Sequence, residues 1–192
     1  CALPGGGAVL VYRDRGEDEL RDFSFTYSTD PGLDRWSSPR AVHKDGWRVD
    51  GCPVNGAALA SNGKELAVAW YTMGADAIPR ILCAWWDAER ASFGAPKTIA
   101  EGKALGRIAA AMLPSGELAI TWLEALGQAG SAEWRLATGA RDAESFDSQG
   151  ILLSDASRAS GISALAVDGE DLLFTCTRVE PSGAVTALRL LR

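Results

Sequence analysis

Carboxylates and arginines alternate in two long polar segments of this chain, and side chains of these types can hold an anionic ligand or transfer a proton. The segments are residues 12–22 (YRDRGEDELRD) and 43–56 (HKDGWRVDGCPVNG). Arginine presents a planar fork of N–H donors that suits a carboxylate, and an aspartate or glutamate can give or take a proton. We therefore take both segments as candidates for a binding or catalytic site. The alternative is a loop surface that is simply solvated.

The sequence offers few residues for other kinds of functional site. His43 is the only histidine, so neither a multi-histidine metal site nor a Ser-His-Asp triad is expected, and we expect no cofactor. Cys83 and Cys176 lie inside apolar, strand-like runs and are expected to be buried thiols, whereas Cys1 and Cys52 have loop-like neighbours and could pair. The net charge of −6 argues against a nucleic-acid partner, and no apolar run is long enough to predict a membrane span.

The composition favours short strands over helices. The 192 residues include 21 glycines and 7 tryptophans, and 47% are hydrophobic. No long segment has the 3.6-residue period of an amphipathic helix, and glycine-rich turns joining apolar strands are typical of an all-β domain. Residues 107–113 are rich in helix formers, so a helix over 107–127 is the alternative there, although Pro114 and Gly116 interrupt it.

One strand-like segment recurs four times, each copy after a turn. The copies start 58, 52 and 54 residues apart: Ala8–Asp14, Leu66–Thr72, Leu118–Glu124 and Leu172–Arg178. A further strand follows each copy, at 22–27, 80–86, 132–137 and 184–191, and after the first three a hairpin ends in Trp36, Phe93 or Phe146. A repeat of about this length is typical of propeller blades. We predict an all-β fold, a β-propeller of four-stranded antiparallel blades with about four blades present.

The repeat units span about 1–43, 57–100, 107–154 and 161–192, and we interpret residues 1–192 as a single propeller domain that is incomplete at its N-terminus. Only Cys1–Leu3 remains of the first strand in the first unit, and no fourth strand follows Leu190. Propeller ends of this kind can close a ring by exchanging a strand. A small four-bladed ring is the alternative.

The repeat also sorts the loops onto two faces. In an antiparallel meander, the links from second to third strand and from the last strand to the next blade lie on one face. That face receives the long links 14–21, 43–56, 73–79, 101–106, 125–131, 154–160 and 179–183. The ends of the recurring strand place Asp14, Thr72, Glu124 and Arg178 at equivalent corners, next to third strands that begin with arginine at Arg21 and Arg80. We expect a pocket there, because functional residues on such scaffolds lie in loops.

The hairpin at residues 28–36 resembles the Asp-box (BNR repeat) of sialidases, with Ser28, Asp30 and Gly32 at the expected spacing and Trp36 one residue later than the pattern. In an Asp-box the aspartate caps the turn and the aromatic ring plugs the sheet. Together with residues 12–22 and the Asp45–Gly56 segment, the chain resembles bacterial exo-sialidase-like β-propeller proteins. The resemblance is firm over residues 12–70 and implies a six-bladed propeller, of which this chain would be a part.

The resemblance also implies a mechanism. Sialidases hold the substrate carboxylate with three arginines, attack with a tyrosine that a glutamate activates, and use an aspartate as acid/base. The Arg-Ile-Pro motif of the first arginine is absent from this sequence. By resemblance, the clamp candidates are Arg13, Arg21, Arg80 and Arg107; the catalytic candidates are Asp14 or Asp50 as acid/base, Glu124 as the activating group and Tyr71 as the nucleophile.

Two further residues complete the expected site. Trp47 is either a platform for a sugar ring or an anchor for its loop, and Asn55 is a substrate-binding candidate from the same segment. The expected function is a sialidase-like glycoside hydrolase that cleaves terminal sialic acid-type residues; the alternatives are a non-catalytic propeller that binds glycan or protein, or a truncated product without activity. The expected partners are a glycan or sialoside and an upstream segment or second chain that completes the propeller. By resemblance we expect a secreted or periplasmic protein.

Overall fold

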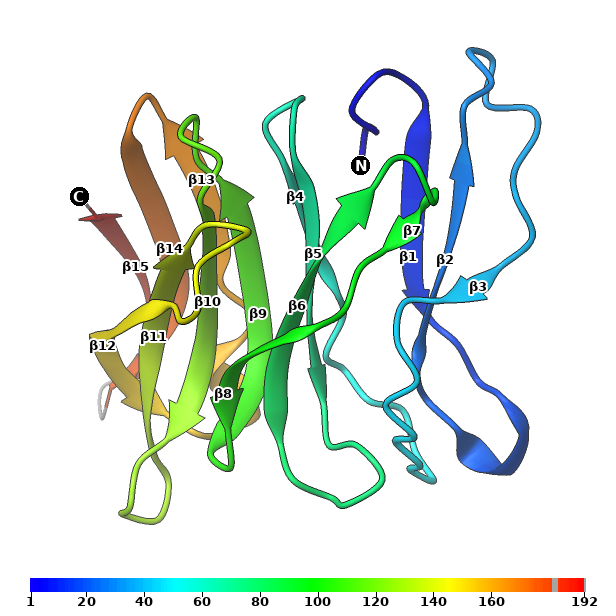
Figure 1. Ribbon diagram of the computed structural model, residues 1–192. Helices are drawn as coiled ribbons and strands as arrows, with labels where there is room; N and C mark the ends of the chain where they lie inside the picture. Colours follow the sequence, from blue (N-terminus) through cyan, green and yellow to red (C-terminus); the bar gives the residue numbers. More distant parts are fainter. Residues whose placement is uncertain (181–182, 192) are drawn as a thin grey trace.

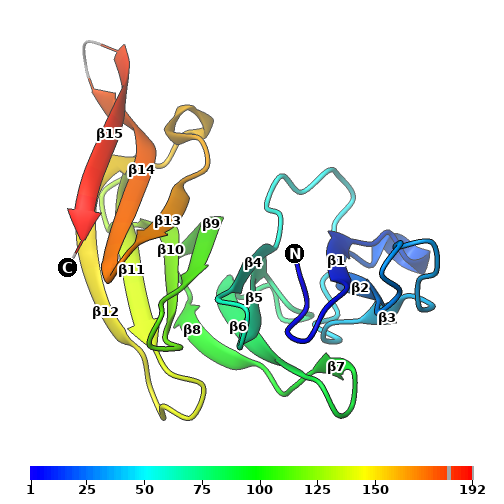
Figure 2. The ribbon, with the colours of Figure 1, turned by 90° about the horizontal axis from the view of Figure 1, so that it is seen from above.

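The computed structural model describes residues 1–180 and 183–191, which include all of the predicted link 179–183 except residues 181 and 182. Strands make up almost all of the regular structure (Figure 1). Within the described part they form four antiparallel sheets, which we name blades 1 to 4 in chain order. The blades follow one another around an arc when seen from above (Figure 2). The predicted all-β propeller architecture is confirmed.

Each blade is built from strands that follow one another in the chain. Blade 1 contains β1 (Ala8–Arg13), β2 (Phe23–Ser28) and β3 (Arg40–Ala41). Blade 2 contains β4 (Ala58–Ser61), β5 (Leu66–Thr72), β6 (Arg80–Asp87), β7 (Ser92–Phe93) and β8 (Lys97–Glu101). In this blade both β7 and β8 pair with β6. Blade 3 contains β9 (Ala104–Met112), β10 (Leu118–Ala125), β11 (Ser131–Gly139) and β12 (Asp147–Asp155). Blade 4 contains β13 (Ala164–Asp168), β14 (Asp171–Glu180) and β15 (Gly183–Leu191), and short 3₁₀ helices occur at η1 (Glu17–Glu19) and η2 (Arg158–Ser160).

The four recurring segments of the sequence are β1, β5, β10 and β14. Each is the second strand of its repeat unit, and we call these four the second strands; in blade 1, residues 1–3 stand in place of the first strand. The helix considered for 107–127 does not form, because this stretch contains most of β9 and all of β10, which pair with each other across a turn. β5 is buried at every position, and a strand covered on both faces reads as a continuous apolar run rather than an alternating one. Residues 1–3 contribute an isolated bridge between Ala2 and Ala8 beside β1.

The hydrophobic core lies between the blades. We call the side of a blade that faces the preceding blade its N-side face and the opposite side its C-side face. The N-side face of blade 2, with Val68 and Trp70, packs against the C-side face of blade 1. The N-side face of blade 3, with Ile120 and Trp122, packs against the C-side face of blade 2, and Phe174 of blade 4 packs against blade 3 in the same way.

The hairpin at 28–36 contains hydrogen bonds within its turn, but its aromatic ring is not buried. The Asp30 carboxylate accepts a hydrogen bond from the Asp34 backbone N–H at 3.0 Å, and the Ser28 hydroxyl accepts one from the Asp30 N–H at 3.1 Å. The Trp36 side chain is 38% exposed and donates to the Leu33 carbonyl at 2.8 Å. The expected plug is therefore wrong for Trp36, because the enlarged turn holds the indole at the surface.

All four cysteines are free thiols. Cys83 and Cys176 are buried, as predicted, and Cys1 and Cys52 are exposed without forming a disulfide. Burial raises the pKa of Cys83 to about 12 and the pKa of Cys176 to about 11.

We expect two fast-reacting thiols in the folded protein, Cys1 and Cys52, and two more only after unfolding in urea. The thiolate is the reactive species, and both burial and a raised pKa suppress it at neutral pH. Titration with Ellman's reagent before and after unfolding measures this directly. A Cys52→Ser variant is the control and should lose one fast thiol; a third fast thiol in the folded wild type would contradict the core placement of Cys83 and Cys176.

Candidate functional site

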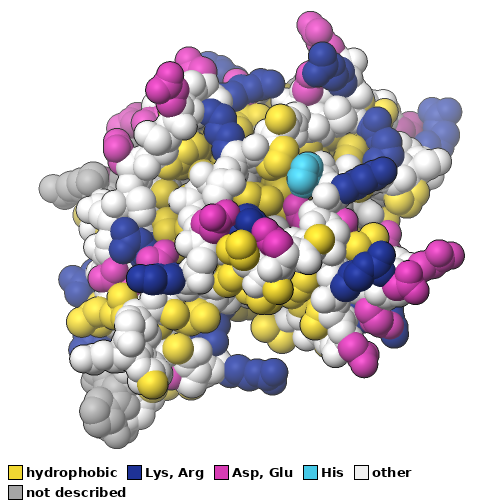
Figure 3. Space-filling model, turned by 60° about the horizontal axis from the view of Figure 1, so that its bottom comes forward, with side chains coloured by type: hydrophobic (Ala, Val, Ile, Leu, Met, Phe, Trp, Pro, Cys, Tyr) yellow, Lys and Arg dark blue, Asp and Glu magenta, His cyan; other side chains and the backbone are white. Residues whose placement is uncertain are grey.

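The predicted loop face exists. The links after β1, β5 and β10 lie at the same end of the blades as the 43–56 segment, at the bottom of Figure 1. Asp14 follows β1 directly, and Thr72, Glu124 and Arg178 lie near the ends of β5, β10 and β14. Figure 3 looks toward this end and shows side chains of both charges lying among hydrophobic ones. The repeat therefore placed these corners correctly.

Four of the predicted residues line one hollow on this face. The hollow has a volume of about 460 Å³ and lies between the link after β1 and the 43–56 segment. Its lining consists of Arg13, Asp14, Arg15, Arg21, Asp50, Gly51, Cys52 and Pro53. It thus brings together two arginine candidates for anion binding and both aspartate candidates for proton transfer.

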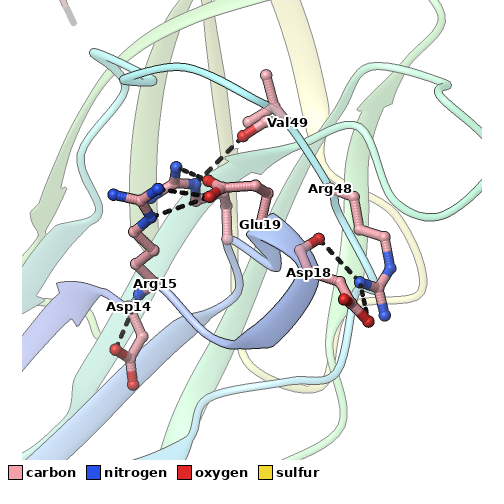
Figure 4. Close-up of polar contacts among 7 residues, drawn as sticks. Asp14, Arg15, Asp18, Glu19, Arg48 and Val49 are labelled. Atoms are coloured by element: carbon pink, nitrogen blue, oxygen red, sulfur yellow. Dashed lines mark hydrogen bonds and ion pairs between the residues drawn. The ribbon is translucent and has the colours of Figure 1, made fainter.

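Ion pairs within the link after β1 organise one wall of the hollow. Glu19 pairs with Arg15 and with Arg21, and the hydrogen bond from Arg15 lowers the pKa of Glu19 (Figure 4). The Arg21 Nε donates to the Val49 carbonyl at 3.3 Å, which ties this link to the 43–56 segment. Asp18 and Glu19 have φ angles of +53° and +58°, so the backbone of η1 is strained where it presents these carboxylates.

The link and the 43–56 segment are joined a second time through Arg48. Its Nη1 donates to the Asp18 carbonyl at 2.9 Å and lies 3.4 Å from the Asp18 carboxylate (Figure 4). Asp14 is held from the other side, because its carboxylate accepts hydrogen bonds from the Arg15 backbone N–H at 2.8 Å and from the Ser24 hydroxyl at 3.1 Å. The Asp14 carboxylate is exposed but fixed in orientation.

Arg13 reaches inward from the end of β1 and braces three backbone carbonyls. Its Nη1 donates to Arg21 O at 2.6 Å, and its Nη2 donates to Asn55 O at 2.9 Å and to Tyr71 O at 3.2 Å. The Arg13 Nε is buried and has no hydrogen-bond partner. Burial lowers the pKa of Arg13 to about 10, so the guanidinium stays protonated at neutral pH.

Two aromatic rings flank the Arg13 guanidinium. Its Cζ lies 4.0 Å from the centroid of the Phe23 ring and 4.6 Å from the centroid of the Trp47 ring. Trp47 is only 7% exposed and packs edge-on against Tyr71, with ring centroids 5.6 Å apart. Of the two roles considered for Trp47, this packing is that of a loop anchor, because the ring is almost fully buried and the Arg13 guanidinium lies over it.

Tyr71 is also buried, and burial raises the pKa of its phenol. A tyrosine nucleophile needs the opposite shift and a neighbouring carboxylate as base. The position therefore resembles that of a core residue beneath Trp47 more than that of a nucleophile.

Asn55 connects Arg13 to Arg107, so three of the predicted substrate-binding residues are in direct contact. The Asn55 Oδ1 accepts a hydrogen bond from the Arg107 backbone N–H at 2.8 Å, and its Nδ2 donates to the Leu105 carbonyl at 3.3 Å. Arg107 lies in an irregular part of β9 with φ of +60°, next to Gly106 with φ of +81°. A bulge of this kind redirects a side chain out of the regular strand pattern.

The Arg107 guanidinium resembles that of Arg13 in its surroundings. Its Nη2 donates to the Ala156 carbonyl at 3.2 Å, and its Nη1 is buried without a hydrogen-bond partner. Burial lowers the pKa of Arg107. Neither Arg13 nor Arg107 forms an ion pair with any residue that the structure describes.

Arg80 and Glu124 lie apart from the hollow and already have partners. Arg80 donates to both oxygens of Asp76 at 2.8 and 2.7 Å and to Glu101 at 2.7 Å. These contacts raise the pKa of Arg80 and lower the pKa of Asp76. Glu124 accepts a hydrogen bond from the Trp122 indole at 3.1 Å. With its fork filled by carboxylates, Arg80 is not free to bind an anionic ligand in this conformation.

Sequence reasoning missed two aspartates that hold the 43–56 segment in place. Asp22 accepts backbone hydrogen bonds from Gly46 at 3.1 Å and Trp47 at 3.2 Å, and burial raises its pKa. Asp45 accepts a hydrogen bond from the Trp70 indole at 2.8 Å and lies 2.8 Å from the His43 Nδ1. The signal in the sequence is the glycine between Asp45 and Trp47, which allows the tight turn. Nothing in the sequence indicates that Asp22 accepts the hydrogen bonds of this turn.

The described residues contain neither a metal-binding group nor a membrane-spanning helix. No group of three or more His, Cys, Asp or Glu side chains is placed to hold a metal ion within residues 1–180 and 183–191. Over the same residues, no helix is long and apolar enough to cross a membrane.

No protein-family model matches this sequence, and no curated protein matches it. Solved structures do match. The Hadza microbial sialidase Hz136 superposes with a TM-score of 0.63 at 15% identity, over 100% of this chain and 43% of that one. The Trypanosoma rangeli sialidase in complex with sialic acid gives a TM-score of 0.56 at 12% identity, over 98% and 35% of the two chains. A mutant of the Trypanosoma rangeli sialidase that displays trans-sialidase activity gives 0.53 at 12% identity, over 93% and 35%.

The chain therefore spans less than half the length of these structures. At such low identity the likeness concerns the fold alone. The hollow and the arginines lie on a sialidase-like β-propeller.

Proposed function

We propose that this chain recognises a carboxylate-bearing sugar of the sialic acid type on its loop face. The observation that supports this most is the pair of half-buried guanidinium groups, Arg13 and Arg107, which are joined through Asn55 and form no direct ion pair with a described residue. Asp22 and Asp45 act on Arg13, and Asp155 acts on Arg107, without direct contact. A buried cation is usually paired directly, and a ligand carboxylate would supply such a contact. The sialidase-like fold favours an acidic sugar as the source of that carboxylate.

Hydrolysis of terminal sialic acid-type residues is the second candidate, and a different observation favours it. Asp14 and Asp50 line the same hollow as Arg13 and Arg21, so an acid/base group and anion-binding groups share one space. The lining of the hollow includes no tyrosine, and Tyr71 lies beneath Trp47. Retaining hydrolysis would need a nucleophile from elsewhere in the protein, whereas recognition does not. Either function fits a secreted or periplasmic location, where such glycans are met.

Isothermal titration with 3′-sialyllactose tests recognition, and lactose is the matched ligand without the carboxylate. We expect binding of the sialoside alone, weakened at least tenfold by Arg107→Met, because one charge-assisted hydrogen bond of a buried guanidinium is worth about 1.5–3 kcal/mol. Arg90→Met is the control, since the Arg90 side chain is exposed and lies away from the hollow. Equal binding of lactose and sialyllactose would refute the proposal.

A fluorogenic sialoside separates hydrolysis from recognition. Turnover that is lost on Asp14→Asn or Asp50→Asn, with binding of sialyllactose retained, would establish catalysis. Binding without turnover would leave a recognition module.

A further inference from the structure

The N-side face of blade 1 is exposed, although it carries the residue types that every other N-side face buries. The repeat aligns Leu10 of β1 with Val68, Ile120 and Phe174 of the other second strands, and each of these three has no exposed surface. Leu10 is 50% exposed. Two residues further along the same face lies Tyr12, which is 37% exposed, whereas the equivalent residues Trp70 and Trp122 are each 1% exposed. An apolar face of this kind on a folded protein indicates a partner.

The C-side face of blade 4 is also exposed, although the equivalent face of blade 3 is buried. The strand registers align Leu188 of β15 with Leu136 of β11, because both lie opposite the same position of the second strand, occupied by Thr175 and Thr121. Leu188 is 69% exposed, whereas Leu136 is 4% exposed against blade 4.

The inner strand of blade 4 repeats this pattern. Ala164 and Ala166 of β13 are exposed and correspond to Ala109 and Ala111 of β9, which are buried. The C-side face of blade 4 thus offers small and aliphatic side chains of the type that receives an N-side face elsewhere in the molecule.

The two exposed faces are therefore the two halves of one standard interface. At each internal interface of the chain, a C-side face meets an N-side face, and the arc in Figure 2 holds blades 1 and 4 apart at its two ends. We propose that the C-side face of blade 4 binds the N-side face of blade 1 of a second copy, head to tail. The faces differ from each other, so the contact is heterologous and continues until a ring closes.

Two copies would contribute eight blades, which is within the range of known propellers. The smallest closed product is thus a symmetric dimer with two identical contacts. An open chain of copies is the product if the arcs do not close.

Sedimentation velocity of the full chain over a wide concentration range tests this proposal. We expect the wild type to form dimers or larger species, and Leu10→Asp and Leu188→Asp each to weaken association at least tenfold, because each places a charge in the proposed contact. Both positions are exposed in the single copy, so folding should be retained; circular dichroism checks this, and Tyr12→Ser with Leu190→Ser is a milder second pair. Leu153→Asp, on the outer strand of blade 3 and 64% exposed, is the control that should leave association unchanged.

Mixing the two single variants distinguishes head-to-tail contact from any other. The Leu10→Asp protein keeps an intact blade 4 face and the Leu188→Asp protein keeps an intact blade 1 face, so an equimolar mixture should give a one-to-one dimer and nothing larger. A wild type that stays monomeric at high concentration would overturn the proposal, because the two exposed faces would then not bind each other. A mixture that stays monomeric, while the wild type associates, would also overturn it.

Discussion

Replacing Arg13 by methionine is expected to lower the free energy of unfolding by about 3 kcal/mol. The substitution keeps an unbranched apolar chain of similar length but removes the donors to Arg21 O, Asn55 O and Tyr71 O, and it removes the cation between the Phe23 and Trp47 rings. Each carbonyl left without a donor costs about 1 kcal/mol or more, partly offset because a buried charge is no longer desolvated. The midpoint of urea unfolding measures the change.

Two further variants serve as comparisons for this prediction. Arg13→Lys keeps the charge but loses the planar fork, and it should be destabilised by about 2 kcal/mol, because one ammonium cannot reach three carbonyls in different directions. Arg90→Met is the control at an exposed position and should change stability by less than about 0.5 kcal/mol. If Arg13→Met matched Arg90→Met, the bracing role of Arg13 would be refuted.

The sequence was sufficient to predict the blades because their signal is local and repeated. β5 and β10 read as apolar runs bounded by turns, and the same run at near-constant spacing fixes both the strands and the side on which each link lies. That register is also why Asp14, Arg21 and Asp50 were expected on one face before any contact was known, whereas Arg13 was a candidate by resemblance. Their meeting in one hollow follows from the order of strands in an antiparallel meander.

The details of the site depended on contacts that leave no local pattern. Whether Trp47 is exposed or buried is decided by Asp22, which is 25 residues away and holds the backbone of the loop against the blade. Arg80 looked like a free arginine at a strand start, but Asp76 and Glu101 occupy its donors. Side chains in irregular segments have no periodicity to indicate which way they point, so a sequence can place them on a face without assigning their partners.

The link between the two unpaired arginines depends on Gly106, and this gives the second large expected effect. Gly106 has φ of +81°, and a Cβ added there would lie 2.4 Å from the Asn55 side chain. Gly106→Ala should therefore be destabilising by about 3 kcal/mol: about 1 kcal/mol for the left-handed backbone and the rest for displacing Asn55 from Leu105 O and the Arg107 N–H. Urea unfolding measures the loss of stability, and titration with sialyllactose reports whether Arg107 is still correctly held.

Gly102→Ala separates the two contributions. Gly102 has a similar φ of +89°, but a Cβ added there meets nothing within 4 Å, so this variant should lose only about 1 kcal/mol. In an Asn55→Ala background the obstructing amide is absent, and Gly106→Ala should then cost no more than Gly102→Ala does in the wild type. An equal cost of Gly106→Ala in both backgrounds would show that the backbone conformation alone requires this glycine. A smaller cost in the Asn55→Ala background would show that the glycine provides the space in which Asn55 joins blade 1 to the bulge that presents Arg107.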